Sequence, residues 1–250
     1  MAKWDNFKEL DSETMLNTVR DIAFPFIKKY NEGSEFNKSL KDLAFIITKP
    51  SLLSETVEGI EQIFNILEED ENGFMDSLGD MYEYLLSEIS SSGKNGQFRT
   101  PRHIIKMMTE LVNPKIGEKV FDPSCGTAGF LIAAMHNMLK KADNDVQKKS
   151  IRQNQLHGIE LRPNMFTIAT TNMILRGDGK SNLEQEDFLK YNPSQLQEKS
   201  CTVGMMNPPY SMGSKNNPSL YEINFTEHLL NSVVQDAKVV VIVPQSSMNG

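Results

Sequence analysis

The apolar positions of this chain change their period partway along the sequence. Before residue 90 they recur every three to four residues, as on one face of a helix, and the pattern is clearest over 76–90. After residue 118, short apolar runs that end in Asp, Glu or Asn alternate with longer helical patterns. This alternation predicts an α/β fold, a parallel sheet with helices on both faces, preceded by a small all-α domain.

Three helices are expected in the first part of the chain. The first would be capped by Asp11 or Ser12 and interrupted at Pro25, the next would be capped by Ser54, and the last would cover 76–90. We expect their apolar stripes to form a core. These stripes are Val19, Ile22 and Phe26, then Val57, Ile60, Phe64 and Leu67, and finally Leu78, Met81, Tyr82, Leu85, Leu86 and Ile89.

A segment rich in Ser and Gly, residues 90–96, is the expected linker. We place the boundary after Ser92, which gives a helical N-terminal domain over 1–92 and a second domain over 93–250. The net charge of −7 is unevenly divided between them, since 1–92 carries 8 Lys and Arg against 19 Asp and Glu, and 93–250 carries 18 against 14. The second domain could therefore meet nucleic acid, although weakly by charge alone, and the first should repel it.

The second domain is expected to open with a helix that has Thr100 as its N-cap and Pro101 as its first residue. Its inward residues would be Ile104, Ile105, Met108, Leu111 and Val112. Strands are expected at 119–122, 156–160, 201–206 and 238–243, a weak strand or a turn at 183–188, and helices at 130–141, 163–175 and 222–235. The charged residues 142–153 are expected to be a loop or the end of a helix. The apolar run 238–243 predicts a strand that is buried on both faces.

A loop of small residues, 123–129, joins the first expected strand to a helix. Its glycines let the backbone approach a ligand closely, and the helix start offers free N–H groups. Asp122 at the strand end favours a cationic ligand over a phosphate. Glu160, at the end of the second strand, is placed to accept hydrogen bonds from ribose hydroxyls. A dinucleotide oxidoreductase is disfavoured, because the third glycine of that fingerprint is missing.

The stretch Asn207-Pro208-Pro209-Tyr210 follows the fourth expected strand. Prolines cannot donate to a sheet ladder, so the strand must stop there. The Asn207 side-chain oxygen and the Pro208 carbonyl can each accept an N–H, while Tyr210 can stack on a ring. This set suits a flat ligand that carries an NH2 group. Taken alone, the stretch is better explained as a strand followed by a Pro-rich turn, and the motifs that precede it in the chain change this balance.

Composition narrows the class of protein further. Hydrophobic residues make up 39% of the chain and charged residues 24%, as in soluble globular proteins. The longest apolar run is too short to span a bilayer, and the N-terminal residues contain no secretory signal. The 2 cysteines give neither a disulfide framework nor metal-ligand spacing. We therefore expect a cytoplasmic protein with no membrane association and no metal site.

Three motifs, in this order, resemble those of the amino-methylating DNA methyltransferases. They are Phe98-x-Thr100-Pro101, then Asp122-Pro123-x-Cys125-Gly126-Thr127-Ala128-Gly129-Phe130, then Asn207-Pro208-Pro209-Tyr210. The wider stretches 96–101 and 122–131 resemble the modification subunit of type I restriction-modification systems. The resemblance covers 75–245 well and the residues before it loosely. The order of the three motifs is specific, whereas one motif alone is not.

The resemblance implies a Rossmann-like methyltransferase that transfers a methyl group from S-adenosylmethionine to N6 of adenine in DNA. Its cofactor-binding residues would be Gln97, Phe98, Arg99, Thr100, Pro101 and Arg102, which close over the cofactor; Asp122, Pro123, Gly126, Thr127, Ala128 and Gly129, which hold its methionine part; Glu160 for the ribose; and Asp187 and Phe188 for the adenine. A target adenine flipped out of the DNA would be held by Asn207, Pro208, Pro209 and Tyr210. The implied partners are DNA, a specificity subunit and a restriction subunit.

Two alternatives stay open. Protein glutamine N5-methyltransferases share Asn-Pro-Pro-Tyr, because a side-chain amide also presents an NH2 group. A non-catalytic scaffold subunit of the same complex would keep the fold without the activity. The family's sheet has two more strands after the one expected at 238–243, so we expect this chain to be part of a longer protein.

Overall fold

The computed structural model describes residues 4–29, 44–68, 78–82, 84, 100–177, 182–210, 212–214 and 216–248. The chain divides into two compact units, Met1–Met81 and Tyr82–Gly250. The expected linker, 90–96, lies outside the described residues, so the boundary after Ser92 stays a prediction.

The described part of the first unit is mainly helical, with residues 44–49 outside any helix. It contains α1 (Trp4–Lys8), α2 (Ser12–Thr18), a π-helical segment (Val19–Ala23), α3 (Phe24–Lys29) and α5 (Pro50–Glu68). Its core consists of Met15 and Leu16 from α2 packed against Leu53 and Val57 from α5. Asp11 caps α2, as predicted, by accepting hydrogen bonds from the backbone N–H groups of Glu13 and Thr14.

Three expectations about the first unit need correction or stay outside the structure. Ile22 and Phe26 are 66% and 53% exposed, so their assignment to the core is wrong. The π-helical segment breaks the 3.6-residue period and turns these later positions away from the core. Ser54 is not a cap, because α5 already begins at Pro50. Of the helix expected over 76–90, residues 78–82 and 84 are helical, and the others lie outside the described residues.

The second unit contains a five-stranded sheet in the order β3-β2-β1-β4-β5, and every pair of neighbours is parallel. The strands are β1 (Val120–Asp122), β2 (Leu156–Ile159), β3 (Asn182–Glu184), β4 (Val203–Met206) and β5 (Lys238–Val241). The predicted parallel sheet is confirmed, although each of the five described strands is shorter than expected. The strand order reverses on either side of β1, which opens a ligand-binding crevice at the carboxyl ends of β1 and β4 in folds of this kind.

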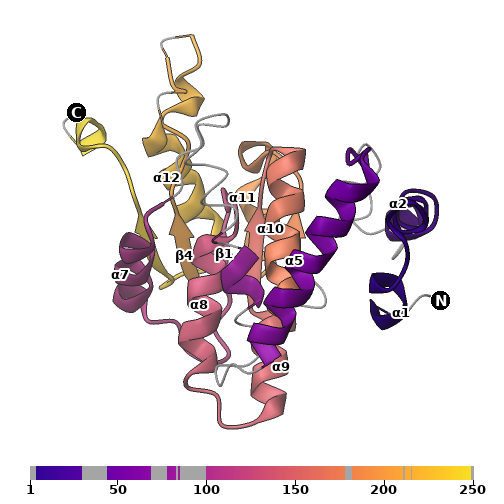
Figure 1. Ribbon diagram of the computed structural model, residues 1–250. Helices are drawn as coiled ribbons and strands as arrows, with labels where there is room; N and C mark the ends of the chain where they lie inside the picture. The colour runs from indigo at the N-terminus through magenta and orange to yellow at the C-terminus, as the bar shows by residue number, and fades with distance from the viewer. Residues whose placement is uncertain are drawn as a thin grey trace. The chain divides into compact units, whose positions relative to one another are not determined.

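Helices cover both faces of this sheet, as predicted (Figure 1). One face packs against α7 (Arg102–Val112), α8 (Gly129–Leu139), α9 (Asp145–Asn154) and α10 (Pro163–Leu175). The other packs against α11 (Pro193–Gln197), α12 (Glu222–Ser232) and the 3-10 segment Phe188–Lys190. Two further 3-10 segments span Pro218–Leu220 and Gln245–Met248. Side chains alternate along β1, so Val120 packs in the core on the face covered by α7 to α10, and Phe121 packs in the core on the face covered by α11 and α12.

A separate helix, α9, occupies the charged stretch that was expected to be a loop or a helix end. Asn144 caps it by accepting a hydrogen bond from the Gln147 N–H at 3.0 Å. Ile151, which is fully buried, anchors it to the core. A helix with a single buried residue has almost no apolar period, and this is why the sequence pattern did not reveal it.

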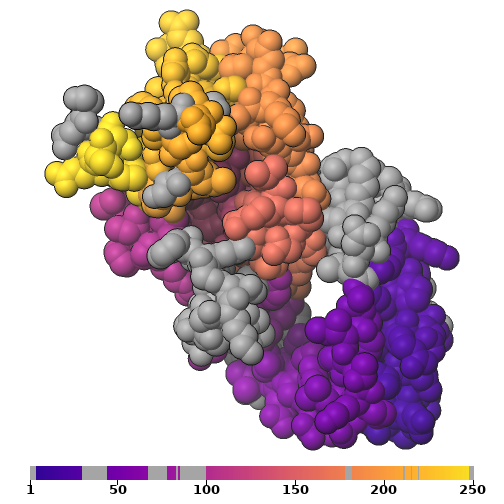
Figure 2. All heavy atoms as spheres, turned by 90° about the horizontal axis from the view of Figure 1, so that it is seen from above, coloured from indigo at the N-terminus to yellow at the C-terminus, as the bar shows by residue number. Residues whose placement is uncertain are grey.

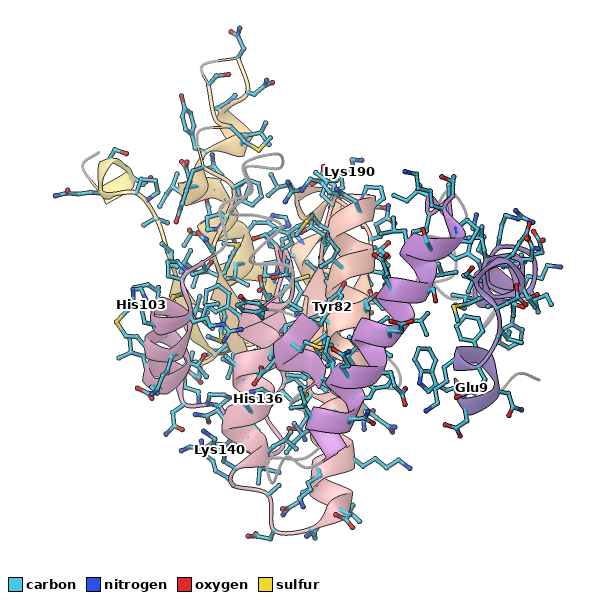
Figure 3. The ribbon with its side chains drawn as sticks, viewed as in Figure 1. Glu9, Tyr82, His103, His136, Lys140 and Lys190 are labelled. Carbon is cyan, nitrogen blue, oxygen red and sulfur yellow. The ribbon has the colours of Figure 1, made fainter. Side chains whose placement is uncertain are left out.

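Two further expectations are wrong in detail. Leu111 is 70% exposed, since Met108 and Val112 form the buried stripe of α7 and Leu111 lies beside it. In Figure 3, His103 marks the exposed side of this helix. Strand β5 is only partly buried at each of its positions, because in the described sheet it has β4 as its one neighbour. None of the helices in the described ranges combines the length and apolar character that a bilayer crossing requires.

Candidate active site

The predicted site residues gather at the carboxyl edge of the sheet. Asp122 ends β1, Glu160 directly follows β2, and Asn207 directly follows β4. Thr100 immediately precedes Pro101 and the start of α7. The parallel arrangement of the strands therefore brings together three motifs that lie far apart in the sequence. Figure 2 shows α7, in magenta, directly beside the orange-to-yellow segment that follows β4.

The loop between β1 and α8 has an open, left-handed turn. Gly126 has φ +56°, and a Cβ placed there would meet no atom within 4 Å. Ala128, fully buried at the N-cap of α8, has φ +66°, a conformation that costs energy for a residue with a Cβ. At Gly129 a Cβ would approach Ile105 Cδ1 to 3.0 Å, so α7 packs closely on the start of α8. The open side of the turn lies at Gly126, where a ligand could reach the backbone.

The same loop is held from both sides by hydrogen bonds. The Gly126 N–H donates to Glu160 Oε2 at 3.0 Å, and the Cys125 N–H donates to the Ile159 carbonyl at 3.0 Å. On its other side, Asn172 of α10 donates from Nδ2 to the Thr127 carbonyl at 2.9 Å. The loop is therefore a fixed structure and not a freely moving segment.

Two acidic side chains lie buried at this edge. Asp122 is 1% exposed and Glu160 is 6% exposed. Burial raises the pKa of Asp122 to about 8; the backbone hydrogen bond from Ser124 opposes the shift, and the charge of Glu160 adds to it. Glu160 also accepts a hydrogen bond from the Arg162 N–H at 2.9 Å. Two buried acids in one place would favour a cationic ligand over an anionic one, and the expected preference of this loop for a cation stays a prediction.

Asn207 is bonded through both its side chain and its backbone. Its Nδ2 donates to Thr100 Oγ1 at 2.8 Å, and its backbone carbonyl accepts a hydrogen bond from Ser124 Oγ at 3.0 Å. Its Oδ1 atom is buried and has no hydrogen-bond partner in the described part of the chain. An unsatisfied buried acceptor costs about 1–3 kcal/mol, so this oxygen is a natural place for a ligand N–H. Thr100 is not the N-cap of α7, because Pro101 takes that position.

The rest of the Asn-Pro-Pro-Tyr stretch combines a buried turn with an exposed ring. Pro208 is buried and Pro209 half-buried, while Tyr210 is 39% exposed. Tyr210 Oη donates to the Ile242 carbonyl, just past β5, at 3.4 Å. Burial, and then the charge of Glu222, raise the pKa of the Tyr210 hydroxyl above its usual value. The ring is thus tethered at its hydroxyl end and still has accessible surface for stacking.

Other predicted residues lie apart from this group or outside the description. Gln97, Phe98 and Arg99 lie outside the described residues, and Pro101 and Arg102 are exposed. Asp187 accepts a hydrogen bond from the Leu189 N–H at 3.1 Å. Phe188 is buried in the core on the face of the sheet that α11 and α12 cover. Its ring is edge-on to Phe121, at 6.1 Å between ring centroids, and to His228, at 4.6 Å. Contact of Asp187 and Phe188 with the cofactor stays a prediction.

The sequence did not single out three residues that shape this site. Ser124 bonds to Asn207, and Asn172 with Arg176 supports the loop from α10. Both Asn172 and Arg176 are fully buried, and Arg176 Nη1 donates to Asn172 Oδ1. An Asn and an Arg four residues apart, near the end of a largely apolar helix, were the available signal, since buried polar groups need a partner.

Comparison with solved structures places this architecture among methyltransferase folds. A structure described as the type I R-M system, from a study of its complex assembly and conformational transition, matches with a TM-score of 0.76 at 22% identity. The match covers 98% of this chain and 53% of the chain in that structure. A methyltransferase subunit of a type I restriction-modification system from Streptococcus thermophilus matches with a TM-score of 0.68 at 21% identity, over 96% of this chain and 55% of that one. The fold is the S-adenosylmethionine-dependent methyltransferase fold.

Comparison of sequences assigns the family. The profile described as N-6 DNA Methylase matches residues 74–249, so the chain belongs to the N-6 DNA methylase family. The type II restriction enzyme and methyltransferase RM.BcgI of Heyndrickxia coagulans is 42% identical over 181 residues, which are 72% of this chain and 28% of that protein. The type I restriction enzyme EcoEI methylase subunit of Escherichia coli is 24% identical over 98% of this chain and 53% of its own length. The chain thus spans about half of the length of the EcoEI methylase subunit and a smaller part of RM.BcgI.

Proposed function

We propose that this chain is the catalytic part of a DNA methyltransferase that transfers a methyl group from S-adenosylmethionine to N6 of adenine. The observation that carries the proposal is the buried, unpartnered Oδ1 of Asn207 at the carboxyl edge of the sheet. Membership of the N-6 DNA methylase family supports the same reaction.

The residues around the glycine loop suit the proposed cofactor. Glu160 would provide negative charge for a ligand that carries a sulfonium and an ammonium group, and Asp122 would add to it once the cation has displaced its proton. The open turn at Gly126 leaves room for its methionine part, and Glu160 keeps lone pairs for ribose hydroxyls. When bound, S-adenosylmethionine supplies an electrophilic methyl group. The roles of Gln97, Phe98, Arg99, Thr100, Pro101 and Arg102 in closing over it, and of Asp187 and Phe188 toward its adenine, belong to the same proposal.

The Asn-Pro-Pro-Tyr residues would activate the target amine. An exocyclic amine on adenine is a poor nucleophile, because its lone pair is delocalised into the ring. Two acceptors, Asn207 Oδ1 and the Pro208 carbonyl, would draw its N–H bonds toward a tetrahedral, nucleophilic geometry. This geometry would free the nitrogen lone pair to accept the methyl group that bound S-adenosylmethionine would supply, and the nitrogen would then lose one of its two protons. Stacking on Tyr210 would return about 1–3 kcal/mol of the cost of flipping the base out of the duplex.

We place this chain in the modification subunit of a type I restriction-modification system. Proteins named as type I restriction enzyme methylase subunits match it over nearly its whole length. The proposed partners are DNA, a specificity subunit and a restriction subunit, and the proposed compartment is the cytoplasm. RM.BcgI, which unites restriction enzyme and methyltransferase in its name, supports a second candidate, in which the chain belongs to a combined protein of that kind.

The proposal is tested by methyl transfer from labelled S-adenosylmethionine to DNA, using the complete protein with and without a co-expressed specificity subunit. Identification of the modified base follows. We expect N6-methyladenine, formed only when a sequence-recognising partner is present. Label in a protein glutamine side chain would favour the glutamine methyltransferase alternative. Cofactor binding without any transfer by the complete complex would favour a scaffold.

A further inference from the structure

The orientation of the Asn207 amide decides whether it can act on an amine. Under the proposed function, on which this inference rests, Oδ1 must face the target N–H. A rotation of 180° about the terminal side-chain bond would exchange Oδ1 and Nδ2, which are alike in size, and would set a donor against a donor. We propose that Thr100 and Ser124 are positioning residues that hold Asn207 with its oxygen toward the target amine.

Thr100 holds the nitrogen end of the amide. Its Oγ1 accepts the hydrogen bond from Asn207 Nδ2 at 2.8 Å, although 107 positions separate the two residues. Asn207 Oδ1, buried and without a partner in the described residues, is left for the substrate. Thr100 is itself anchored, because the next residue, Pro101, accepts backbone hydrogen bonds from Ile104 and Ile105 at 3.0 and 3.1 Å. The first turn of α7 therefore fixes the hydroxyl that orients the amide.

Ser124 fixes the backbone from which this side chain projects. Its Oγ donates to the Asn207 carbonyl at 3.0 Å, and its own N–H donates to Asp122 Oδ1 at 3.2 Å. The ring of Pro208 restricts the backbone on the following side. Asn207 is thus held by the loop after β1 and by the residue before α7. The two contacts link the proposed cofactor loop to the proposed base acceptor through hydrogen bonds.

The decisive variant is Thr100→Val, which keeps the shape of the side chain and removes its hydroxyl. At saturating cofactor and DNA, we expect the single-turnover rate of methyl transfer to fall about tenfold, the effect of roughly one hydrogen bond. Thr100→Ser should restore the rate. The matched control is Thr109→Val, where a buried hydroxyl of α7 donates to the Ile105 carbonyl of the same helix at 2.8 Å. It should lower the melting temperature without changing the rate.

Ser124→Ala is the second variant and carries the test if Thr100→Val does not fold. It should also lower the rate at saturating cofactor. The proposal is overturned if the folded variants transfer methyl at the wild-type rate once cofactor is saturating, since Thr100 and Ser124 would then serve only cofactor binding. A wild-type protein that does not methylate adenine would instead contradict the proposed function. In that case a crystal structure of Thr100→Val decides: a displaced Asn207 side chain supports the positioning role, and an unmoved one refutes it.

Discussion

Asp122 is a carboxylic acid that keeps its proton at neutral pH. Its pKa is raised to about 8, chiefly by burial and further by the charge of Glu160. A cationic ligand at this position would favour the carboxylate form, so binding and proton release should be linked. The structure thus connects the charge of the proposed cofactor to a measurable pH dependence.

The affinity for S-adenosylmethionine should rise as the pH increases toward about 8 and then level off. Below that pH the protein must lose the Asp122 proton before the carboxylate can meet the cation, and above it the proton is already gone. Calorimetry across this range, in buffers of different ionisation enthalpy, would measure both the affinity and the released proton. In Asp122→Asn the dependence should disappear. An affinity that does not vary with pH in the wild type would show that Asp122 does not meet the cofactor's charge.

Tyr210 should contribute through its ring more than through its hydroxyl. The hydroxyl makes one long contact, 3.4 Å to the Ile242 carbonyl, while the ring is 39% exposed. Tyr210→Phe should therefore lower methyl transfer only mildly, and Tyr210→Ala should weaken capture of the flipped base by about 1–3 kcal/mol. Fluorescence of a base analogue at the target position would report the capture. Equal losses in the two variants would argue against stacking.

At the scale of elements, Gly158 of β2 packs closely against Leu183 of β3 and Leu131 of α8. A Cβ on Gly158 would lie 2.6 Å from Leu183 Cδ2 and 3.0 Å from Leu131 Cδ1. This close approach lets the Cys125 N–H donate a hydrogen bond to the Ile159 carbonyl at the end of β2. That hydrogen bond positions the glycine loop relative to the sheet. The packing of β2 is therefore part of the geometry of the site.

Gly158→Ala should destabilise the protein by about 1–3 kcal/mol, because neighbouring side chains must shift to admit the methyl group. Thermal or urea unfolding would measure the change. Gly59→Ala is the matched control: Gly59 lies within α5, and a Cβ there meets nothing within 4 Å. That substitution should be neutral or should stabilise by up to about 1 kcal/mol. Equal unfolding midpoints for the two variants would contradict the packing argument.

The order of the helices and strands was predictable from the sequence, but the side-chain contacts that connect them were not. Alternating apolar runs and helical patterns predicted the parallel sheet, and the end of each run placed Asp122, Glu160 and Asn207 at one edge. The Thr100–Asn207 hydrogen bond spans 107 positions and leaves no local pattern. Helix α9 was missed because its only buried residue is Ile151. Sequence periodicity reports burial of whole faces, so contacts made by single polar side chains escape it.

At the scale of the whole molecule, the distribution of charge limits what the chain can bind unaided. Residues 1–92 hold 8 Lys and Arg against 19 Asp and Glu, whereas 93–250 hold 18 against 14. Affinity for DNA comes mainly from neutralising phosphates, and within a chain of net charge −7 only residues 93–250 have a small positive excess to offer. Its relatives are about twice as long, or longer.

This polypeptide should therefore bind duplex DNA weakly at physiological salt and without sequence preference. Fluorescence anisotropy with a specific and a scrambled duplex, over a range of salt concentrations, would measure both properties. The complete protein with its proposed specificity subunit provides the comparison and should bind tightly and selectively. A tight, sequence-selective footprint from this polypeptide alone would reveal a recognition element within it.

The central claim is that Asn207 acts on the target amine and does not merely close a turn. The most direct measurement compares wild type and Asn207→Ala in the complete enzyme, with methyl transfer, cofactor affinity and melting temperature recorded on the same samples. We predict that transfer falls by orders of magnitude while cofactor affinity and melting temperature stay near the wild-type values, since the lost contact forms mainly in the transition state. A stable Asn207→Ala enzyme that methylates adenine at the wild-type rate would contradict the account.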